Sequence, residues 1–135
     1  LAPFECLCGN FILPEPASYV FFYAFSNLRN LLYIIPASRP VIAAKRDNMD
    51  EYDTIFVGFP IWWYIAPTII NTFLESYNLK GKTVITFATS GGSGMGKTNE
   101  KLTPSCPGAK LLHGKVFNSY SSKADLSAWV ETISP

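Results

Sequence analysis

The sequence has few of the side chains that most enzymes use for catalysis or metal binding. It contains one histidine, His113, and three cysteines, Cys6, Cys8 and Cys106. An odd number of cysteines without a framework spacing argues against a disulfide-stapled secreted domain. No second cysteine pair or nearby histidine completes a metal site at Cys6 and Cys8. We therefore expect no metal and predict a reducing, cytoplasmic location.

Basic runs and long apolar runs are also missing. The longest basic run is Lys45-Arg46 and the net charge is +1, so nucleic acid is not an expected partner. The apolar segment 11–33 is broken by prolines and polar residues, and it lacks the roughly 20 consecutive apolar residues of a membrane span. No basic region precedes this segment, which argues against a signal peptide.

Apolar and aromatic residues are abundant instead. Hydrophobic residues make up 48% of the 135 residues and charged residues 16%, which is typical of one folded domain, predicted to span residues 1–135. Residues 1–18 show no clear period and contain several prolines, so they are predicted to form an irregular N-terminal arm.

Strands and helices are predicted to alternate from Tyr52 onward. Thr54–Phe59 and Thr83–Ala88 are apolar on both faces, as buried parallel strands are. An apolar helical stripe over residues 67–77 joins them. The other predicted elements are strands at 19–25, 32–35 and 110–117 (interrupted at His113-Gly114), and helices at 94–102 and 123–133 (capped by Ser122). This alternation predicts an α/β fold.

Unusual loops follow the two central predicted strands. One strand runs into Pro60-Ile61-Trp62-Trp63-Tyr64, and the other runs into Thr89-Ser90-Gly91-Gly92-Ser93-Gly94. Ligands of open α/β sheets bind beyond the carboxyl ends of the strands. Neighbours on an extended chain face opposite ways, so at least one tryptophan is expected to be exposed as a stacking platform. The glycine-rich loop is expected to offer free backbone N–H groups. Together the loops suit a planar, hydrogen-bonding ligand such as a flavin ring.

The glycine-rich loop also allows a second interpretation. Gly91, Gly96, Lys97 and Thr98 meet the Gly-x-x-x-x-Gly-Lys-Ser/Thr spacing of a phosphate-binding loop. No carboxylate at the end of a second strand is placed to bind magnesium. A nucleotide- or phosphate-binding protein that uses residues 91–98 is therefore an alternative.

No side-chain nucleophile or acid–base pair emerges from the sequence. We predict no catalytic residue, and any redox chemistry would belong to a bound cofactor.

From Ser38 to its C-terminus the chain resembles the flavodoxin-like family, especially its small bacterial flavoproteins. The resemblance rests on residues 52–63, 66–67, 69–75, 81–83, 89–94, 107–109 and 125–129. It implies a flavodoxin-like three-layer sandwich with a mostly parallel central sheet. It also implies bound FMN, with loop 60–64 against the isoalloxazine ring and loop 89–94 on the polar edge of that ring. The implied function is electron transfer or NAD(P)H/quinone-type oxidoreduction with a redox partner protein or a small-molecule acceptor.

The front of the chain departs from the family pattern. The family opens with a strand, a phosphate loop of the Ser/Thr-x-Thr-Gly-Asn-Thr kind and a long helix. Here residues 20–25 and Ser26 resemble that strand and the first loop residue, but residues 27–30 replace the rest of the loop. Residues 32–37 resemble the second strand, which comes too soon because a parallel crossover needs a dozen or more residues. We therefore expect a truncated or rearranged N-terminus.

This departure has consequences for the cofactor and for assembly. FMN phosphate is normally held by a helix N-terminus and by loop N–H groups. Without that cradle, FMN binding is expected to be weakened or lost although the ring-binding loops remain. A missing first helix would leave one sheet face bare near the first strand, and the N-terminal arm over residues 1–25 or a second subunit could cover it, which favours a homodimer. A flavodoxin-fold interaction module or remnant without cofactor is the alternative to a flavin-binding oxidoreductase.

Overall fold

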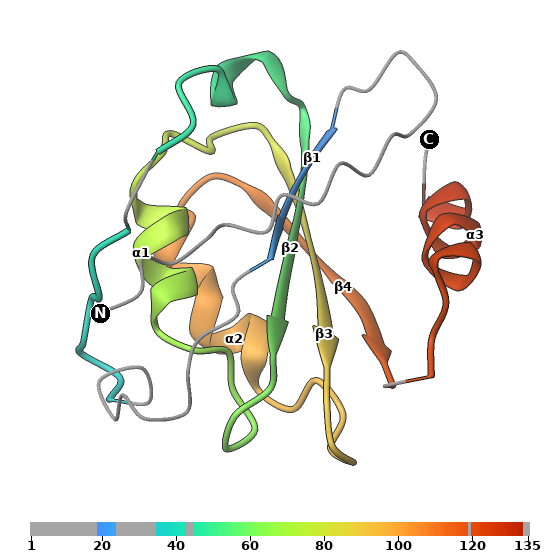
Figure 1. Cartoon of the computed structure of the whole chain (residues 1–135). Coiled ribbons are helices and arrows are strands. Elements are labelled where there is room, and N and C mark those ends of the chain that lie inside the picture. Colours follow the sequence, from blue (N-terminus) through green and yellow to red (C-terminus); the bar gives the residue numbers. More distant parts are fainter. Residues whose placement is uncertain (1–18, 24–34, 43–44, 119, 134–135) are drawn as a thin grey trace.

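The structure is a computed structural model, and it describes residues 19–23, 35–42, 45–118 and 120–133. For residues 19–23 it describes the backbone alone. The elements in chain order are β1 (Tyr19–Tyr23), η2 (Met49–Glu51), β2 (Thr54–Pro60), α1 (Ile69–Glu75), β3 (Thr83–Thr89), α2 (Thr98–Leu102), η3 (Thr103–Ser105), β4 (Lys110–Phe117) and α3 (Lys123–Ile133) (Figure 1). Among the described helices, none is long and apolar enough to cross a bilayer.

The four described strands form one parallel sheet in the order β1-β2-β3-β4. Thr54 pairs with Tyr19 on one side and with Thr83 on the other, and Thr83 pairs in turn with Lys110. In β2 and β3 the five inner residues of each strand are all buried, so both faces of the central strands are covered. The mostly parallel central sheet implied by the resemblance is confirmed.

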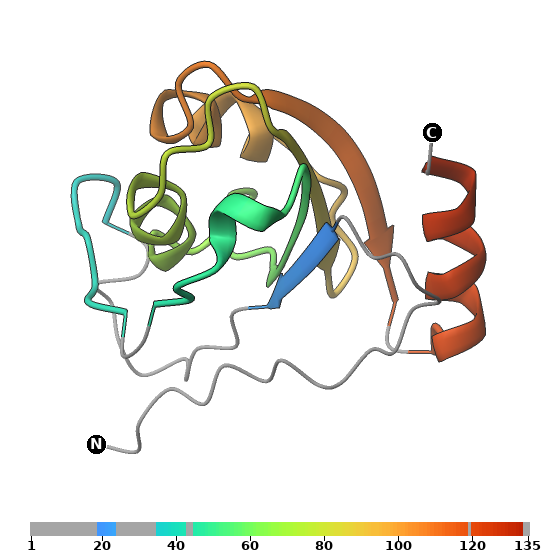
Figure 2. The ribbon, with the colours of Figure 1, turned by 90° about the horizontal axis from the view of Figure 1, so that it is seen from above.

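Helices cover both faces of the sheet. Figures 1 and 2 show α1 and α2 on one face and α3 on the other. On the first face Ile55, Val57 and Phe59 of β2 pack in a core with α1 and α2. On the second face Phe56 packs in a separate core with α3. This arrangement is the predicted three-layer α/β sandwich.

The indole of Trp129 joins α3 to the sheet. Its ring centroid lies 5.7 Å from that of Phe56, 6.0 Å from that of Phe87 and 5.4 Å from that of Phe117. These are the distances and tilted or edge-on orientations that aromatic pairs prefer. The helix predicted over residues 123–133 is therefore held against the second face of the sheet by its apolar side chains.

A reciprocal pair of hydrogen bonds begins α3. The Asp125 N–H donates to Ser122 Oγ (3.2 Å), while the Asp125 carboxylate accepts from the Ser122 N–H (2.7 Å) and hydroxyl (2.8 Å). This is a capping box, and it confirms the predicted cap at Ser122. The backbone hydrogen bond from Ser122, reinforced by its hydroxyl, lowers the pKa of Asp125 from its ordinary value.

Replacing Ser122 by alanine is expected to lower the free energy of unfolding by about 1 kcal/mol, because it leaves a helix N–H group unsatisfied. Urea denaturation followed by circular dichroism measures the change. Ser121→Ala is the matched control, because the described hydrogen bonds of Ser121 go to the side chain and backbone of Asn118, ahead of the helix. Equal midpoints for the two variants would contradict the cap.

Strand β4 contains a bulge opposite the middle of β3. Ile85 pairs with Leu112 and Phe87 pairs with Lys115, so Thr86 alone faces both His113 and Gly114. The interruption predicted at His113-Gly114 is thus an irregularity inside one continuous strand. A bulge puts an extra residue in one strand and brings its backbone close to the neighbouring strand.

Two predicted helices are shorter in the structure. The helix predicted over residues 67–77 spans Ile69–Glu75, and Pro67 accepts a hydrogen bond from Ile70 N–H (2.9 Å) in the turn that begins it. The helix predicted from Gly94 begins instead at Thr98. Gly96 accounts for the later start, because its φ of 54° lies in the left-handed region, which a right-handed helix excludes.

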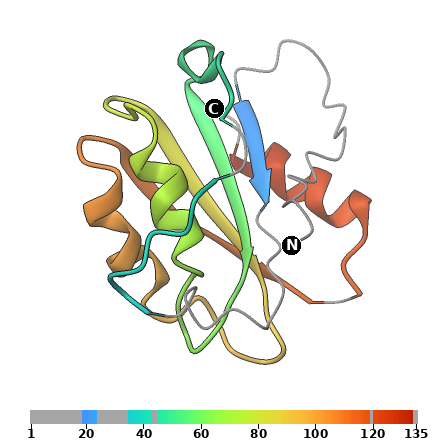
Figure 3. The same cartoon turned by 60° about the vertical axis from the view of Figure 1, so that its left-hand side comes forward.

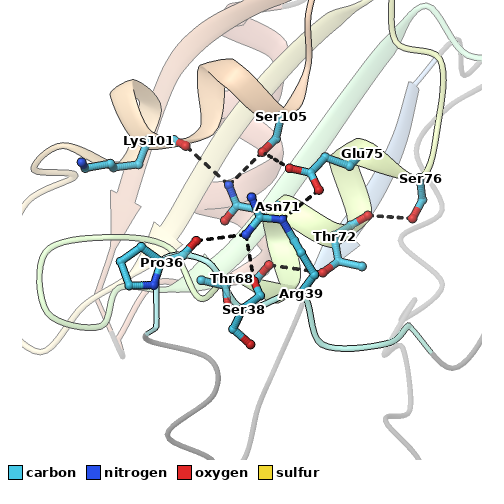
Figure 4. Close-up of polar contacts among 10 residues, drawn as sticks. All are labelled: Pro36, Ser38, Arg39, Thr68, Asn71, Thr72, Glu75, Ser76, Lys101 and Ser105. Atoms are coloured by element: carbon cyan, nitrogen blue, oxygen red, sulfur yellow. Dashed lines mark hydrogen bonds and ion pairs between the residues drawn. The ribbon is translucent and has the colours of Figure 1, made fainter.

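Polar side chains tie α1 to η3 and to residues 36–39 (Figure 4). Arg39 Nε donates to Glu75 Oε2 at 2.8 Å, and Ser105 Oγ donates to Glu75 Oε1 at 2.8 Å. Asn71 Nδ2 in turn donates to Ser105 Oγ at 2.9 Å. The hydrogen bond from Arg39 is the main cause that lowers the pKa of Glu75 from its ordinary value.

Replacing Glu75 by glutamine is expected to reduce stability only where the carboxylate is charged. A carboxyl whose pKa is lowered on folding stabilises the fold above its unfolded pKa, and this contribution is lost as pH falls through the folded pKa. The pair is well exposed, with side chains 38% and 40% accessible, so the loss at pH 7 is expected to be about 0.5 kcal/mol. Urea midpoints at pH 7 and at pH 3 measure it. A deficit of equal size at both pH values would contradict the prediction.

Candidate functional site

The two predicted ligand loops leave the sheet side by side. Pro60 at the end of β2 pairs with Thr89 at the end of β3. Beyond this pair the Ile61 N–H donates to the Thr89 carbonyl at 2.9 Å, so the sheet pairing continues into the loops. Figure 3 shows both loops at the same end of the sheet. This is the edge where open α/β sheets bind their ligands.

The first loop turns back on itself at Trp63 and Tyr64. Trp62 N–H donates to Ile65 O at 3.0 Å, and Ile65 N–H donates to Trp62 O at 3.1 Å. The two residues between them have φ values of 51° and 68°. Positive φ at both central residues of a two-residue hairpin is the pattern of a type I′ turn, which normally carries Asn-Gly or Asp-Gly. Two aromatic residues at these positions strain the backbone.

The turn separates the two tryptophans. Trp63 is 79% exposed and Tyr64 is 67% exposed, whereas Trp62 is half-buried and packs against the core beneath α1. Ile61 packs against the same core. The prediction that at least one tryptophan is exposed is therefore correct. The strained turn presents an indole and a phenol ring to solvent at the ligand edge of the sheet.

The hydroxyl of Ser90 organises the second loop. It accepts from the Gly92 N–H at 3.2 Å and from the Ser93 N–H at 2.9 Å, and it lies 2.9 Å from Ser93 Oγ. The expectation of free N–H groups is therefore wrong for these two residues, because a side chain within the loop already satisfies them. A ligand oxygen that binds these N–H groups must replace Ser90 Oγ.

Gly91 and Gly94 fit the expectation that the glycine-rich loop offers free backbone N–H groups. Both are exposed, and no heavy atom lies within 4 Å of the position a Cβ would take. Among the described residues, none accepts a hydrogen bond from either of their amides. These two positions allow a ligand to approach the backbone closely.

The phosphate-loop alternative does not fit this geometry. Thr98, which would bind the magnesium ion of a nucleotide, is fully buried, with 0% exposure. It lies at the first position of α2, and its hydroxyl is buried without a hydrogen-bond partner among the described residues. A buried hydroxyl cannot ligate a metal held by a solvent-facing nucleotide. The resemblance of Gly91, Gly96, Lys97 and Thr98 to a nucleotide loop is therefore confined to sequence.

Other reactive side chains lie away from these loops or outside the described residues. His113 is exposed on β4, and burial raises the pKa of the Cys106 thiol beside α2. In the part of the chain that the structure describes, no group of three metal-ligating side chains occurs. Ser26, predicted as a cofactor contact, lies outside the described residues, as do Cys6 and Cys8.

Two residues of the site escaped sequence reasoning. Ile65 closes the hairpin, and Gly96 contacts Tyr64. The usual sequence signal for such a hairpin is Asn-Gly at the turn, and here Trp63-Tyr64 stands in its place. The only sequence signal for Gly96 was its place in the phosphate-loop spacing, which pointed to a different function.

Comparison with known proteins identifies the family. The family model described as Flavodoxin matches residues 32–133, which is most of the chain. The chain belongs to the flavodoxin family. A comparison with curated proteins returns no significant match.

Two solved structures resemble the chain closely. One is a "putative flavoprotein" from Bacteroides eggerthii DSM 20697, with 42% identity over 74% of this chain and a TM-score of 0.64. The other, from Bacteroides uniformis ATCC 8492 and designated in the same words, has 43% identity over 73% of this chain and a TM-score of 0.65. The match spans 62% of the length of each of those proteins.

Proposed function

We propose that this chain binds a flavin, FMN in particular, at the edge formed by loops 60–64 and 89–94. The observation that carries the proposal is the pair of exposed aromatic rings at Trp63 and Tyr64, held in a strained turn beside a glycine-rich loop. Strained backbone collects at ligand sites, where a fixed geometry is useful. Membership of the flavodoxin family supports a flavin as the ligand.

The chain's own residues would bind and orient the ring. Trp63 or Tyr64 would stack on its flat face, while Gly91 and Gly94 would donate N–H groups to its polar edge. Pro60 and Ile61 would fix the root of the first loop through the bond to Thr89. A bound flavin supplies transfer of one or two electrons, which fits electron transfer or NAD(P)H/quinone-type oxidoreduction. The partner would be a redox protein or a small-molecule acceptor.

We also propose that the phosphate group of FMN contributes little to its affinity for this chain. The family's phosphate loop is missing from the sequence after Ser26, whereas both ring loops are present. A site that holds the ring alone gains little from the phosphate group. We therefore expect FMN and riboflavin to bind with nearly equal affinity.

Titration of the apo protein with FMN and with riboflavin, followed by flavin fluorescence, tests the proposal. The expected result is quenching by both ligands with dissociation constants within about threefold, a difference of less than 1 kcal/mol. FMN binding a hundredfold tighter than riboflavin would show that a phosphate site exists. No quenching by either ligand would reject flavin binding and favour the interaction module without cofactor.

The homodimer and the cytoplasmic location predicted from the sequence stay proposals. A second copy would cover the sheet face near β1 that a missing first helix would leave bare. Light scattering at high micromolar concentration measures the mass, and a clean monomer would contradict the dimer.

A further inference from the structure

Gly96 occupies a position that the flavin proposal does not explain. Its φ is 54°, in the left-handed region. A Cβ at this position would lie 2.8 Å from the backbone oxygen of Tyr64, 3.4 Å from its Cβ and 3.6 Å from its carbonyl carbon. Contacts below 3.0 Å essentially never occur for a real Cβ. Only glycine fits here without moving Tyr64.

The residue that Gly96 touches is the second central residue of the strained turn. Tyr64 has a φ of 68°, which a side-chain-bearing residue rarely adopts. Such a backbone persists only where the surrounding structure holds it. The Trp62–Ile65 hydrogen bonds hold the base of the turn, and the Ile61–Thr89 bond holds its root. Gly96 lies against the carbonyl at its tip.

We propose that Gly96 is a positioning residue for the aromatic turn. By close backbone contact with the Tyr64 carbonyl, it keeps Trp63 and Tyr64 in the conformation that presents their rings to a ligand. The two loops then form one preassembled surface. The identity of the ligand rests on the proposed flavin function, whereas the coupling between the loops does not.

Backbone amide exchange in the free protein tests this coupling. The variants are Gly96→Ala and Gly96→Asn, since asparagine tolerates a left-handed backbone but still brings a Cβ against Tyr64. The controls are Gly81→Ala and Gly92→Ala, whose φ values are 80° and 151° and whose Cβ positions are empty to 4 Å. These controls reproduce the backbone strain without the contact.

The amides of Trp62 and Ile65 are expected to exchange about tenfold faster in both Gly96 variants, because the turn opens more often. In both controls their exchange is expected to match that of the wild-type protein. Unchanged exchange in the Gly96 variants would overturn the proposal, as would equal acceleration in all four proteins.

Flavin titration gives a separate readout. Riboflavin affinity is expected to fall about tenfold in the Gly96 variants and to stay within about twofold in Gly81→Ala. If the wild-type protein binds no flavin, the proposed function fails, while amide exchange still decides the role of Gly96.

If the Gly96→Ala protein does not fold, a double-mutant cycle still tests the proposal. In a Tyr64→Gly background the turn can yield, so Gly96→Ala is expected to be tolerated better than in the wild-type background. Equal loss of folded protein in both backgrounds would overturn the proposal.

Discussion

Replacing Gly114 by alanine is expected to destabilise the protein by about 3 kcal/mol or more, the largest loss expected from a single substitution. Gly114 lies in the β4 bulge, where its backbone is packed against β3. A Cβ at this position would overlap the carbonyl oxygen and carbon of Thr86. Thr86 sits in the middle of β3, paired with Val57 on its other side. Neither strand can move without breaking pairs of the central sheet.

Urea denaturation measures this loss, and Gly94→Ala is its matched control. Gly94 is exposed, and a Cβ there meets no heavy atom within 4 Å. Its midpoint is expected to stay close to that of the wild-type protein. A Gly114→Ala protein as stable as Gly94→Ala would show that the bulge accommodates a side chain, and the register described for β4 would then be wrong.

The double substitution Trp63→Asn with Tyr64→Gly is expected to make the protein more stable and its ligand binding weaker. Asn-Gly is the preferred pair for a type I′ turn, so the left-handed strain is relieved. Relief at two positions, offset in part by the greater freedom of glycine in the unfolded chain, should raise the free energy of unfolding by about 1–2 kcal/mol. The hydrogen bonds between Trp62 and Ile65 need not change.

Flavin affinity is expected to move in the opposite direction. Loss of both exposed rings removes the stacking surface, whose geometry contributes about 0.5–1.5 kcal/mol beyond the area it buries. The dissociation constant for riboflavin should therefore rise about tenfold or more, since about 1.4 kcal/mol corresponds to a factor of ten. Fluorescence titration and urea denaturation of the same protein measure the two effects together.

Tyr120→Asn is the control for this pair of measurements. Tyr120 is 91% exposed on the loop after β4, and its φ is not positive. Its replacement is expected to change neither stability nor flavin affinity. A double variant no more stable than the wild-type protein would argue against strain in the turn. Unchanged flavin affinity would place the ligand elsewhere.

A double variant that is more stable than the wild-type protein but binds flavin more weakly would show why the turn carries aromatic residues. A turn selected for stability alone would carry Asn-Gly, as most two-residue hairpins of this type do. This turn carries two large aromatic residues in the left-handed region at the ligand edge of the sheet. A local conflict of this kind is expected where function, rather than folding, determines the choice of residue.

The layers of the fold could be predicted from local sequence patterns. The continuous apolar runs at residues 54–59 and 83–88 predicted buried parallel strands, and both strands extend by one residue beyond them. The helix predicted over residues 123–133, with Ser122 as its cap, matches α3 at both ends. These predictions succeed because burial on one or both faces leaves a period that residues close in sequence already show.

The conformations of loops 60–64 and 89–94 could not be predicted from the sequence in the same way. Trp63 and Tyr64 carry no turn signal, because aromatic residues prefer extended backbone. The turn forms because the structure around it overrides that preference. The amides of Gly92 and Ser93 were expected to be free, but Ser90 Oγ binds them. The glycine-lysine-threonine spacing indicated a phosphate site, whereas Thr98, the first residue of α2, is buried.

The sequence by itself determined the α/β class, the order of the central elements and the two loops that leave the sheet side by side. It could do so because hydrophobic period and turn residues are local properties. The tertiary structure alone decided which aromatic rings face solvent, which amides are occupied and why residue 96 is glycine. These depend on contacts between residues far apart in the chain, such as that of Gly96 with the Tyr64 carbonyl, which no local pattern records.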